Sequence, residues 1–202
     1  MTPALAKRLI IGGMVAIGTL LILALYLPGL RPNPNDNTVE GSAAIGGAFT
    51  LTDHTGATVT EQALLGHYSL IYFGFTYCPD ICPMTLQTVA DAIEILPGQK
   101  GESVQPIFIT LDPKRDTVET MSAYVSNFHS SMIGLTGTQD QVQKAADAYR
   151  VFFREAPIGE DGDYTIDHSG FLYLMNRGGR YIDHFGKDVT MEDLSARLRE
   201  LL

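Results

Sequence analysis

Beyond residue 45 the hydrophobic pattern of the chain alternates between short apolar runs and amphipathic segments. Residues 68–76 and 104–111 are nearly continuous apolar runs, which are typical of strands buried on both faces of a sheet. Residues 83–96 repeat apolar side chains at helical spacing. We predict the remaining elements to be a short strand at 48–52, helices at 117–128, 140–152 and 191–202, and a hairpin of strands at 171–175 and 181–185.

The order of these elements predicts one folded domain of the α/β class. It reads strand–helix–strand–helix–strand–strand–helix with a helical insertion, and such alternation implies a sheet covered on both faces. Two cysteines, Cys78 and Cys82, follow the first central strand directly. Parallel strands followed by a hairpin, with cysteines in that place, favour a thioredoxin-like fold over residues 45–202.

The most apolar part of the chain lies before this domain. Residues 9–27 carry no charged side chain, and a helix of that length spans about 28 Å, close to the thickness of a bilayer core. We expect residues 1–8 in the cytoplasm, residues 9–27 as a transmembrane anchor, and residues 28–44, rich in Pro, Asn and Gly, as a linker. A cleaved signal peptide is the alternative, although its apolar core is usually shorter, about 7–15 residues.

The basic residues around the apolar segment indicate its orientation. Lys7 and Arg8 precede it, whereas Arg31 alone lies just beyond it, and this bias weakly favours a cytoplasmic N-terminus. No Arg-rich, Ser-rich transit sequence precedes the segment. We therefore expect a single-pass protein of the bacterial inner (cytoplasmic) membrane, with its C-terminal domain in the periplasm.

The charge of the chain is strongly asymmetric. Residues 1–31 hold three of the 14 basic residues and no acidic residue, so residues 32–202 hold 11 basic and 23 acidic residues, a net charge of −12. Such an acidic domain argues against nucleic acid as a partner. It is suited to attracting metal ions or a positively charged partner, or simply to solubility.

The two cysteines are the strongest chemical signal. They are the only cysteines of the chain, and a disulfide between residues so close together closes almost no loop. Pro83 suits the first turn of a helix, which places Cys82 at or near the helix N-terminus, where a thiolate is stabilised. Their Cys-x-x-x-Cys spacing therefore favours redox chemistry or metal binding over a purely structural disulfide.

Three motifs resemble those of the Sco/SenC family of copper proteins. They are GFTYCPDICP at residues 74–83, LDPKRDT at 111–117 and DHS at 167–169, in that order along residues 45–202. Tyr77 is a departure, since several members have His at this position. The resemblance implies a thioredoxin-like fold and one copper ion, Cu(I) or Cu(II), bound by Cys78, Cys82 and His168.

The same resemblance implies a function and partners. Family members assemble the dinuclear CuA centre of cytochrome c oxidase, so the implied role is a copper metallochaperone. Its partners would be the copper-bearing subunit of the oxidase and a periplasmic copper donor. Some members are thought to reduce the cysteines of the same target, so a membrane-anchored thiol–disulfide oxidoreductase is the alternative.

His168 is also favoured by its place in the predicted fold. It directly precedes a strand expected beside the cysteine strand, where redox proteins of this fold have a cis-proline and this chain has none. Asp112 and Asp167 are candidates for orienting a metal-bound imidazole. The other histidines are predicted to be surface or structural residues: His54, His67, His129 and His184.

Two thiolates and an imidazole suit copper, because thiolates favour Cu(I) and imidazole also binds Cu(II). Zinc is the chemical alternative for such a ligand set. A peroxidase of the peroxiredoxin kind shares the fold, but its Pro and Thr before a single cysteine are missing here. A membrane-bound redox or copper sensor is neither supported nor excluded by the sequence.

Overall fold

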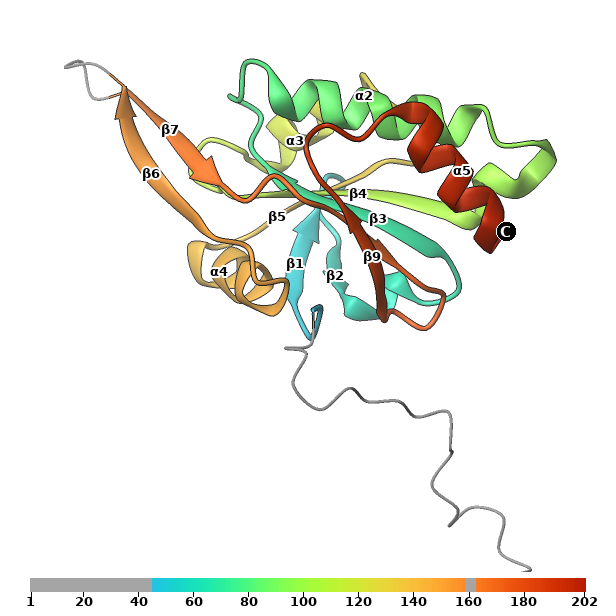
Figure 1. The fold of residues 1–202 in the computed structure, drawn as a ribbon. Coiled ribbons are helices and arrows are strands. Elements are labelled where there is room, and N and C mark those ends of the chain that lie inside the picture. The colour runs from blue at the N-terminus through green and yellow to red at the C-terminus, as the bar shows by residue number, and fades with distance from the viewer. Residues whose placement is uncertain (1–44, 159–162) are drawn as a thin grey trace, which may run out of the picture. The chain divides into compact units, whose positions relative to one another are not determined.

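The computed structural model describes residues 45–158 and 163–202, which form a seven-stranded sheet with helices on both faces and a separate hairpin (Figure 1). The predicted cytoplasmic segment, anchor and linker, residues 1–8, 9–27 and 28–44, lie outside the described residues. Among the residues that are described, none of the helices combines the length and apolar character needed to cross a bilayer.

The strands fall into two sheets. The order in the main sheet is β2-β1-β5-β4-β3-β8-β9, and β6 pairs with β7. Only β3, β4 and β5 run parallel to one another, and the other pairs are antiparallel. The strands are β1 (Thr50–Asp53), β2 (Thr58–Thr60), β3 (Tyr68–Gly74), β4 (Val104–Thr110), β5 (Ile133–Thr136), β6 (Phe153–Ile158), β7 (Asp163–His168), β8 (Leu172–Met175) and β9 (Tyr181–Phe185).

The helices cover the two faces of the main sheet unequally. Helices α2, α3 and α5 lie over one face, and α4 lies over the other (Figure 1). The α-helices are α2 (Ile81–Glu94), α3 (Val118–Val125), α4 (Gln139–Ala148) and α5 (Met191–Leu201), and two 3₁₀ helices, η2 (Glu61–Leu64) and η3 (Gly98–Ser103), precede β3 and β4. The result is a mixed α/β domain of the thioredoxin-like kind.

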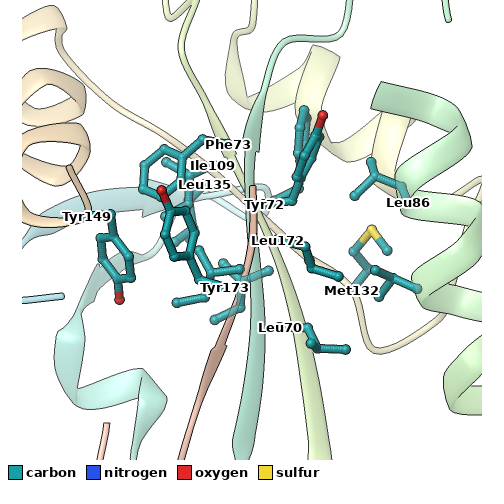
Figure 2. Close-up of a cluster of buried hydrophobic side chains, with 14 of the residues drawn as sticks. Leu70, Tyr72, Phe73, Leu86, Ile109, Met132, Leu135, Tyr149, Leu172 and Tyr173 are labelled. Atoms are coloured by element: carbon teal, nitrogen blue, oxygen red, sulfur yellow. The ribbon is translucent and has the colours of Figure 1, made fainter. Parts of the chain in front are cut away.

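Strand β3 supplies the core on both faces of the sheet because its successive side chains alternate. Tyr72 points toward α2, where Leu86 lies, and Phe73 points toward Tyr149 and Tyr173 on the opposite side (Figure 2). The rings of Phe73 and Tyr149 are 5.3 Å apart. Residues 70–73 are all at most 1% exposed, which explains why this strand reads as a continuous apolar run.

The strand pairing determines which loops meet. In the parallel register Gly74 pairs with Thr110, so the loops after β3 and β4 leave the sheet at the same edge. Strand β8 runs antiparallel to β3, and its first residue, Leu172, pairs with Tyr72. The segment that precedes β8 therefore arrives at the edge where the cysteine loop begins.

The predicted strands 68–76 and 104–111, the hairpin 171–185 and the four helices are confirmed within a few residues. The predicted order was wrong in omitting β2, β5 and the β6–β7 hairpin. Strands β2 and β5 have only three and four residues, too few for a periodic pattern. The sequence of β6, FREAPI, does not alternate, and that of β7, DYTIDH, alternates polar and apolar residues over only a short strand. The helix predicted at 140–152 ends at Ala148, because Arg150 takes a positive φ of 59°.

Phe108, fully buried in β4, offers a test of this core. Its ring lies 5.4 Å from that of Tyr124 in α3, so truncation opens a cavity that the neighbours fill only partly. Phe108→Ala should lower the free energy of unfolding by about 3–5 kcal/mol. Phe152→Ala, at a position 62% exposed, should change it by less than about 0.5 kcal/mol. Urea denaturation followed by circular dichroism measures both, and equal effects would contradict the described core.

Candidate metal centre

The cysteine loop connects the end of β3 to the start of α2. Cys78 donates its backbone N–H to the carbonyl oxygen of Phe75, which turns the chain sharply after the strand. Helix α2 begins at Ile81, and Asp80 at its N-cap makes no side-chain capping bond. Instead the Cys78 sulfur accepts the backbone N–H of Cys82 at 3.4 Å. The sulfur thus takes the role of a capping group, in a position that favours negative charge.

Cys82, the second residue of α2, points into the core and is completely buried. Its sulfur occupies space that exists because residue 74 is glycine. A Cβ at Gly74 would lie 2.7 Å from Cys82 Sγ and 3.0 Å from the ring of Phe108. The last residue of β3 therefore defines the position of this thiol.

His168, at the end of β7, lies beside this thiol. Its Nε2 lies 3.9 Å from Cys82 Sγ, although the two residues are 86 positions apart in sequence. The imidazole packs edge-on against Tyr72 and Phe75, with ring centres 6.2 and 6.0 Å away. Its Nδ1 lies 3.1 Å from the carbonyl oxygen of Ser169. When Nδ1 carries the proton and donates to this oxygen, the Nε2 lone pair is available to a metal.

The two thiols have opposite proton affinities. The pKa of Cys78 is lowered to about 5, first by a hydrogen bond from the Cys82 thiol and further by the backbone N–H groups of Asp80 and Cys82 and by nearby His168, against the effect of burial. The pKa of Cys82 is raised, because its proton is shared with Cys78 and because it is buried. Of the two thiols, Cys78 is therefore the one that loses its proton more readily, and the two titrate as a coupled pair.

The geometry comes close to that of a metal site. With metal bonds of about 2.3 Å to sulfur and about 2.0 Å to nitrogen, the two donor atoms stand about 3.5–3.7 Å apart. The observed separation of 3.9 Å between Cys82 Sγ and His168 Nε2 needs a shift of only a few tenths of an ångström. Among residues 45–158 and 163–202, no three His, Cys, Asp or Glu side chains are already closed into a metal cluster. A metal held by these side chains would require their donor atoms to move closer together.

The two aspartates proposed to orient the imidazole are engaged elsewhere. Asp167 forms an exposed ion pair with Arg154 across the β6–β7 hairpin. Asp112 is buried and forms an ion pair with Arg115, and its Oδ1 accepts a hydrogen bond from the Tyr164 hydroxyl at 2.9 Å. The Ser169 carbonyl oxygen takes the position beside His168 Nδ1 instead.

Asp116 has a role at this edge that the sequence did not reveal. It resembles an ordinary residue before a helix, but its carboxylate is buried and accepts the backbone N–H of Thr76 at 3.0 Å and the Thr110 hydroxyl at 2.6 Å. Burial raises its pKa. The carboxylate thus ties the start of the cysteine loop to the end of β4.

The other four histidines lie away from this cluster. His54 Nδ1 accepts the backbone N–H of Gly134, His129 bonds to Ser131, and Nδ1 of His184 lies 2.6 Å from the hydroxyl of Tyr181. His67 precedes β3, at the opposite end from the cysteine loop. His168 is the histidine whose ring lies beside Cys82 among the described residues.

The fold and this cluster define a class of protein: a thioredoxin-like domain with two thiols and an imidazole converging at one edge of its sheet. Comparison of the sequence with protein families makes the assignment specific. Residues 37–202 match the family model described as SCO1/SenC. The chain belongs to the SCO1/SenC family, as its motifs predict.

Individual relatives support the assignment along most of the chain. A SCO2-like protein of Rickettsia prowazekii is 40% identical over 183 residues, which cover 90% of this chain and 89% of that protein. The human protein SCO2 homolog, mitochondrial, is 38% identical over 201 residues, covering 98% of this chain and 76% of the human protein.

Two similar structures contain copper. That of Bradyrhizobium japonicum ScoI with copper bound is 42% identical, with a TM-score of 0.73, and covers 79% of this chain and all of that chain. That of yeast Sco1 with copper bound is also 42% identical, with a TM-score of 0.72, and covers 78% of this chain and 88% of that chain. In both cases the sequence identity of 42% indicates a common family and not merely a common fold.

The unequal thiols predict distinct alkylation profiles. In the reduced protein, the rate of Cys78 carboxamidomethylation by iodoacetamide should rise with a midpoint near pH 5 and level off above about pH 6, because only the thiolate reacts. Cys82 should stay unmodified over this range. Cys82→Ala should move the Cys78 midpoint upward, since the largest cause of the lowered pKa is lost. Peptide mass spectrometry measures both sites, and a wild-type midpoint near that of an ordinary thiol would contradict the assignment.

Proposed function

We propose that this protein binds one copper ion through Cys78, Cys82 and His168 and delivers it during assembly of the CuA centre of cytochrome c oxidase. The observation that carries this proposal is the convergence of two thiols and an imidazole, with Cys82 Sγ 3.9 Å from His168 Nε2. The copper-bound structures of ScoI and Sco1 support the choice of metal.

The ligand chemistry favours Cu(I) in the reduced protein. Two sulfur donors suit this soft ion, and one imidazole completes a three-donor set that leaves a position open to a ligand of a recipient. Cys78 ionises more readily than Cys82, so the proton that binding must displace belongs chiefly to Cys82. Affinity should therefore increase with pH. Oxidation of the two thiols to a disulfide would remove both sulfur donors.

We also propose that residues 9–27 anchor the protein in the bacterial inner membrane and that the domain works in the periplasm. The uncharged apolar composition of this segment supports the anchor. Anchoring would hold the domain close to a membrane-embedded oxidase subunit and raise its effective concentration there. A periplasmic copper donor would then load the reduced site.

A second function, reduction of disulfides in a target, is favoured by one observation. Both cysteines are free thiols, and Cys78 has the lowered pKa of a nucleophilic cysteine. The two functions differ in their dependence on His168. Reductase turnover would need both cysteines and tolerate His168→Ala, whereas copper transfer would need all three residues.

His168→Ala should reduce the affinity for Cu(I) by at least about tenfold, because one of three donors is lost. The full chain is kept in mild detergent, reduced without oxygen, and titrated in competition with a chromogenic Cu(I) chelator. His184→Ala is the matched control, since His184 lies in β9 beside Tyr181, and its affinity should equal that of the wild type. Unchanged affinity in His168→Ala, or negligible binding by the wild type, would favour the reductase.

Gly74→Ala tests the space that holds the Cys82 sulfur. The new methyl group would lie 2.7 Å from Cys82 Sγ, so the thiol must shift and Cu(I) affinity should decrease by about tenfold or more. Gly170→Ala is the control close to His168, because a Cβ there meets nothing within 4 Å. The same chelator competition measures both, and equal affinities would show that this sulfur is not fixed by Gly74.

A further inference from the structure

The hairpin that carries His168 stands apart from the main sheet. Among the described strands, β6 and β7 pair only with each other. Figure 1 shows them running outward from the edge where the cysteine loop lies. A two-stranded hairpin is marginally stable by itself. Since His168 is the last residue of β7, any contact that holds β7 also determines where the imidazole lies.

Arg115, in the loop between β4 and α3, holds β7 at Tyr164. Its Nη1 donates to the Tyr164 carbonyl oxygen at 3.0 Å, and its guanidinium carbon lies 3.8 Å from the centre of the Tyr164 ring. The Tyr164 hydroxyl donates to Asp112 Oδ1, and the other Asp112 oxygen is paired with Arg115. Asp112, at the centre of these contacts, is only 2% exposed, whereas Arg115 and Tyr164 are partly buried. We call Asp112, Arg115 and Tyr164 the arginine clamp.

The arginine clamp also reaches the cysteine loop. The same guanidinium carbon lies 4.7 Å from the centre of the Tyr77 ring, and Tyr77 directly precedes Cys78. Tyr164 comes four residues before His168 on β7. One side chain therefore connects the segment that carries a thiol to the strand that carries the imidazole. A planar guanidinium can lie against aromatic rings while it forms hydrogen bonds in its own plane, which an ammonium group cannot do.

We propose that Arg115 is a positioning residue for the third metal ligand. The arginine clamp holds β7 so that His168 Nε2 stays within reach of a metal bound to the two sulfur atoms. This inference rests on the proposed copper site, and it assigns Arg115 no direct contact with the metal. Arg115 influences copper affinity only by positioning His168. Substitution of Arg115 should therefore have no effect on affinity when His168 is absent.

The chain provides a matched control at the neighbouring position. Lys114 also contacts the hairpin, through an ion pair with Glu155 in β6. Both side chains of that pair are largely exposed, 60% and 49%, and exposed ion pairs contribute little to structure. Lys114 Nζ also lies 5.8 Å from the centre of the Tyr164 ring, but its ion pair is with Glu155 and not with a residue of the arginine clamp. Lys114→Met thus removes a positive charge and a hairpin contact while leaving the hydrogen bonds and the ion pair of the arginine clamp in place.

The test is a double-mutant cycle on the full chain in mild detergent, reduced and free of oxygen. Cu(I) affinity is measured by competition with a chromogenic chelator for wild type, Arg115→Met, His168→Ala and the double variant. Arg115→Met should weaken binding about tenfold when His168 is present and less than about twofold when it is absent. Lys114→Met should change affinity less than about twofold in both backgrounds. Circular dichroism and urea denaturation establish that each variant folds.

Other outcomes overturn the inference in distinguishable ways. Equal losses in both backgrounds would show that Arg115 acts on the cysteines or on the fold, and no loss would show that His168 needs no clamp. If the wild type binds no Cu(I), or if His168→Ala alone has no effect, the proposed function fails and this inference with it. Should Arg115→Met fail to fold, Arg115→Lys replaces it, because it keeps the charge beside Asp112 but not the planar stack. The same dependence on His168 is then expected.

Discussion

The antiparallel pairing of β8 with β3 is the constraint on which the candidate metal centre depends. Parallel β3 and β4 bring Gly74 and Thr110 to one edge of the sheet, and the pairing of Leu172 with Tyr72 brings the chain before β8 to the same edge. Two residues 86 positions apart thereby come within 3.9 Å of one another. Shifting β8 by one residue would turn its side chains to the other face of the sheet. The register of one strand pair therefore positions both the core and the site.

The hydrogen bond between the two thiols, together with their different surroundings, gives them opposite proton affinities. Cys82 is enclosed beneath the sheet edge, in the space that Gly74 leaves, whereas Cys78 lies where the N–H groups of the first turn of α2 stabilise a negative charge. The buried carboxylate of Asp116 holds Thr76, and so fixes the start of the loop between strand and helix. The two sulfur atoms are consequently held by elements that the main sheet and α2 keep rigid. The Cys82 sulfur in particular cannot move far without disturbing the core.

The sequence predicted the elements that have a strong pattern and missed those held in place by tertiary contacts. The apolar run before Cys78 and the helix after it were recognisable from residue types alone, and the motifs indicated His168. Strand β5 is too short for periodicity, β6 does not alternate, and the alternation of β7 is short and lies next to no other recognisable strand. Asp112 was recognised as important, but its partners Arg115 and Tyr164 come together only through the fold. Arg115 and Tyr164 are 49 positions apart, and no pattern of neighbouring residues in the sequence indicates their contact.

The three candidate donors are thus held by two different parts of the fold. The sulfur atoms belong to the junction of β3 and α2, whereas the imidazole belongs to a hairpin outside the main sheet. His168 can move without breaking any hydrogen bond of the seven-stranded sheet, but Cys82 cannot move without opening the start of α2. In the proposed copper carrier, a ligand of the recipient would therefore displace the imidazole before either sulfur. The arginine clamp would then set how readily this first exchange occurs, because it determines how firmly the hairpin returns His168 to the metal.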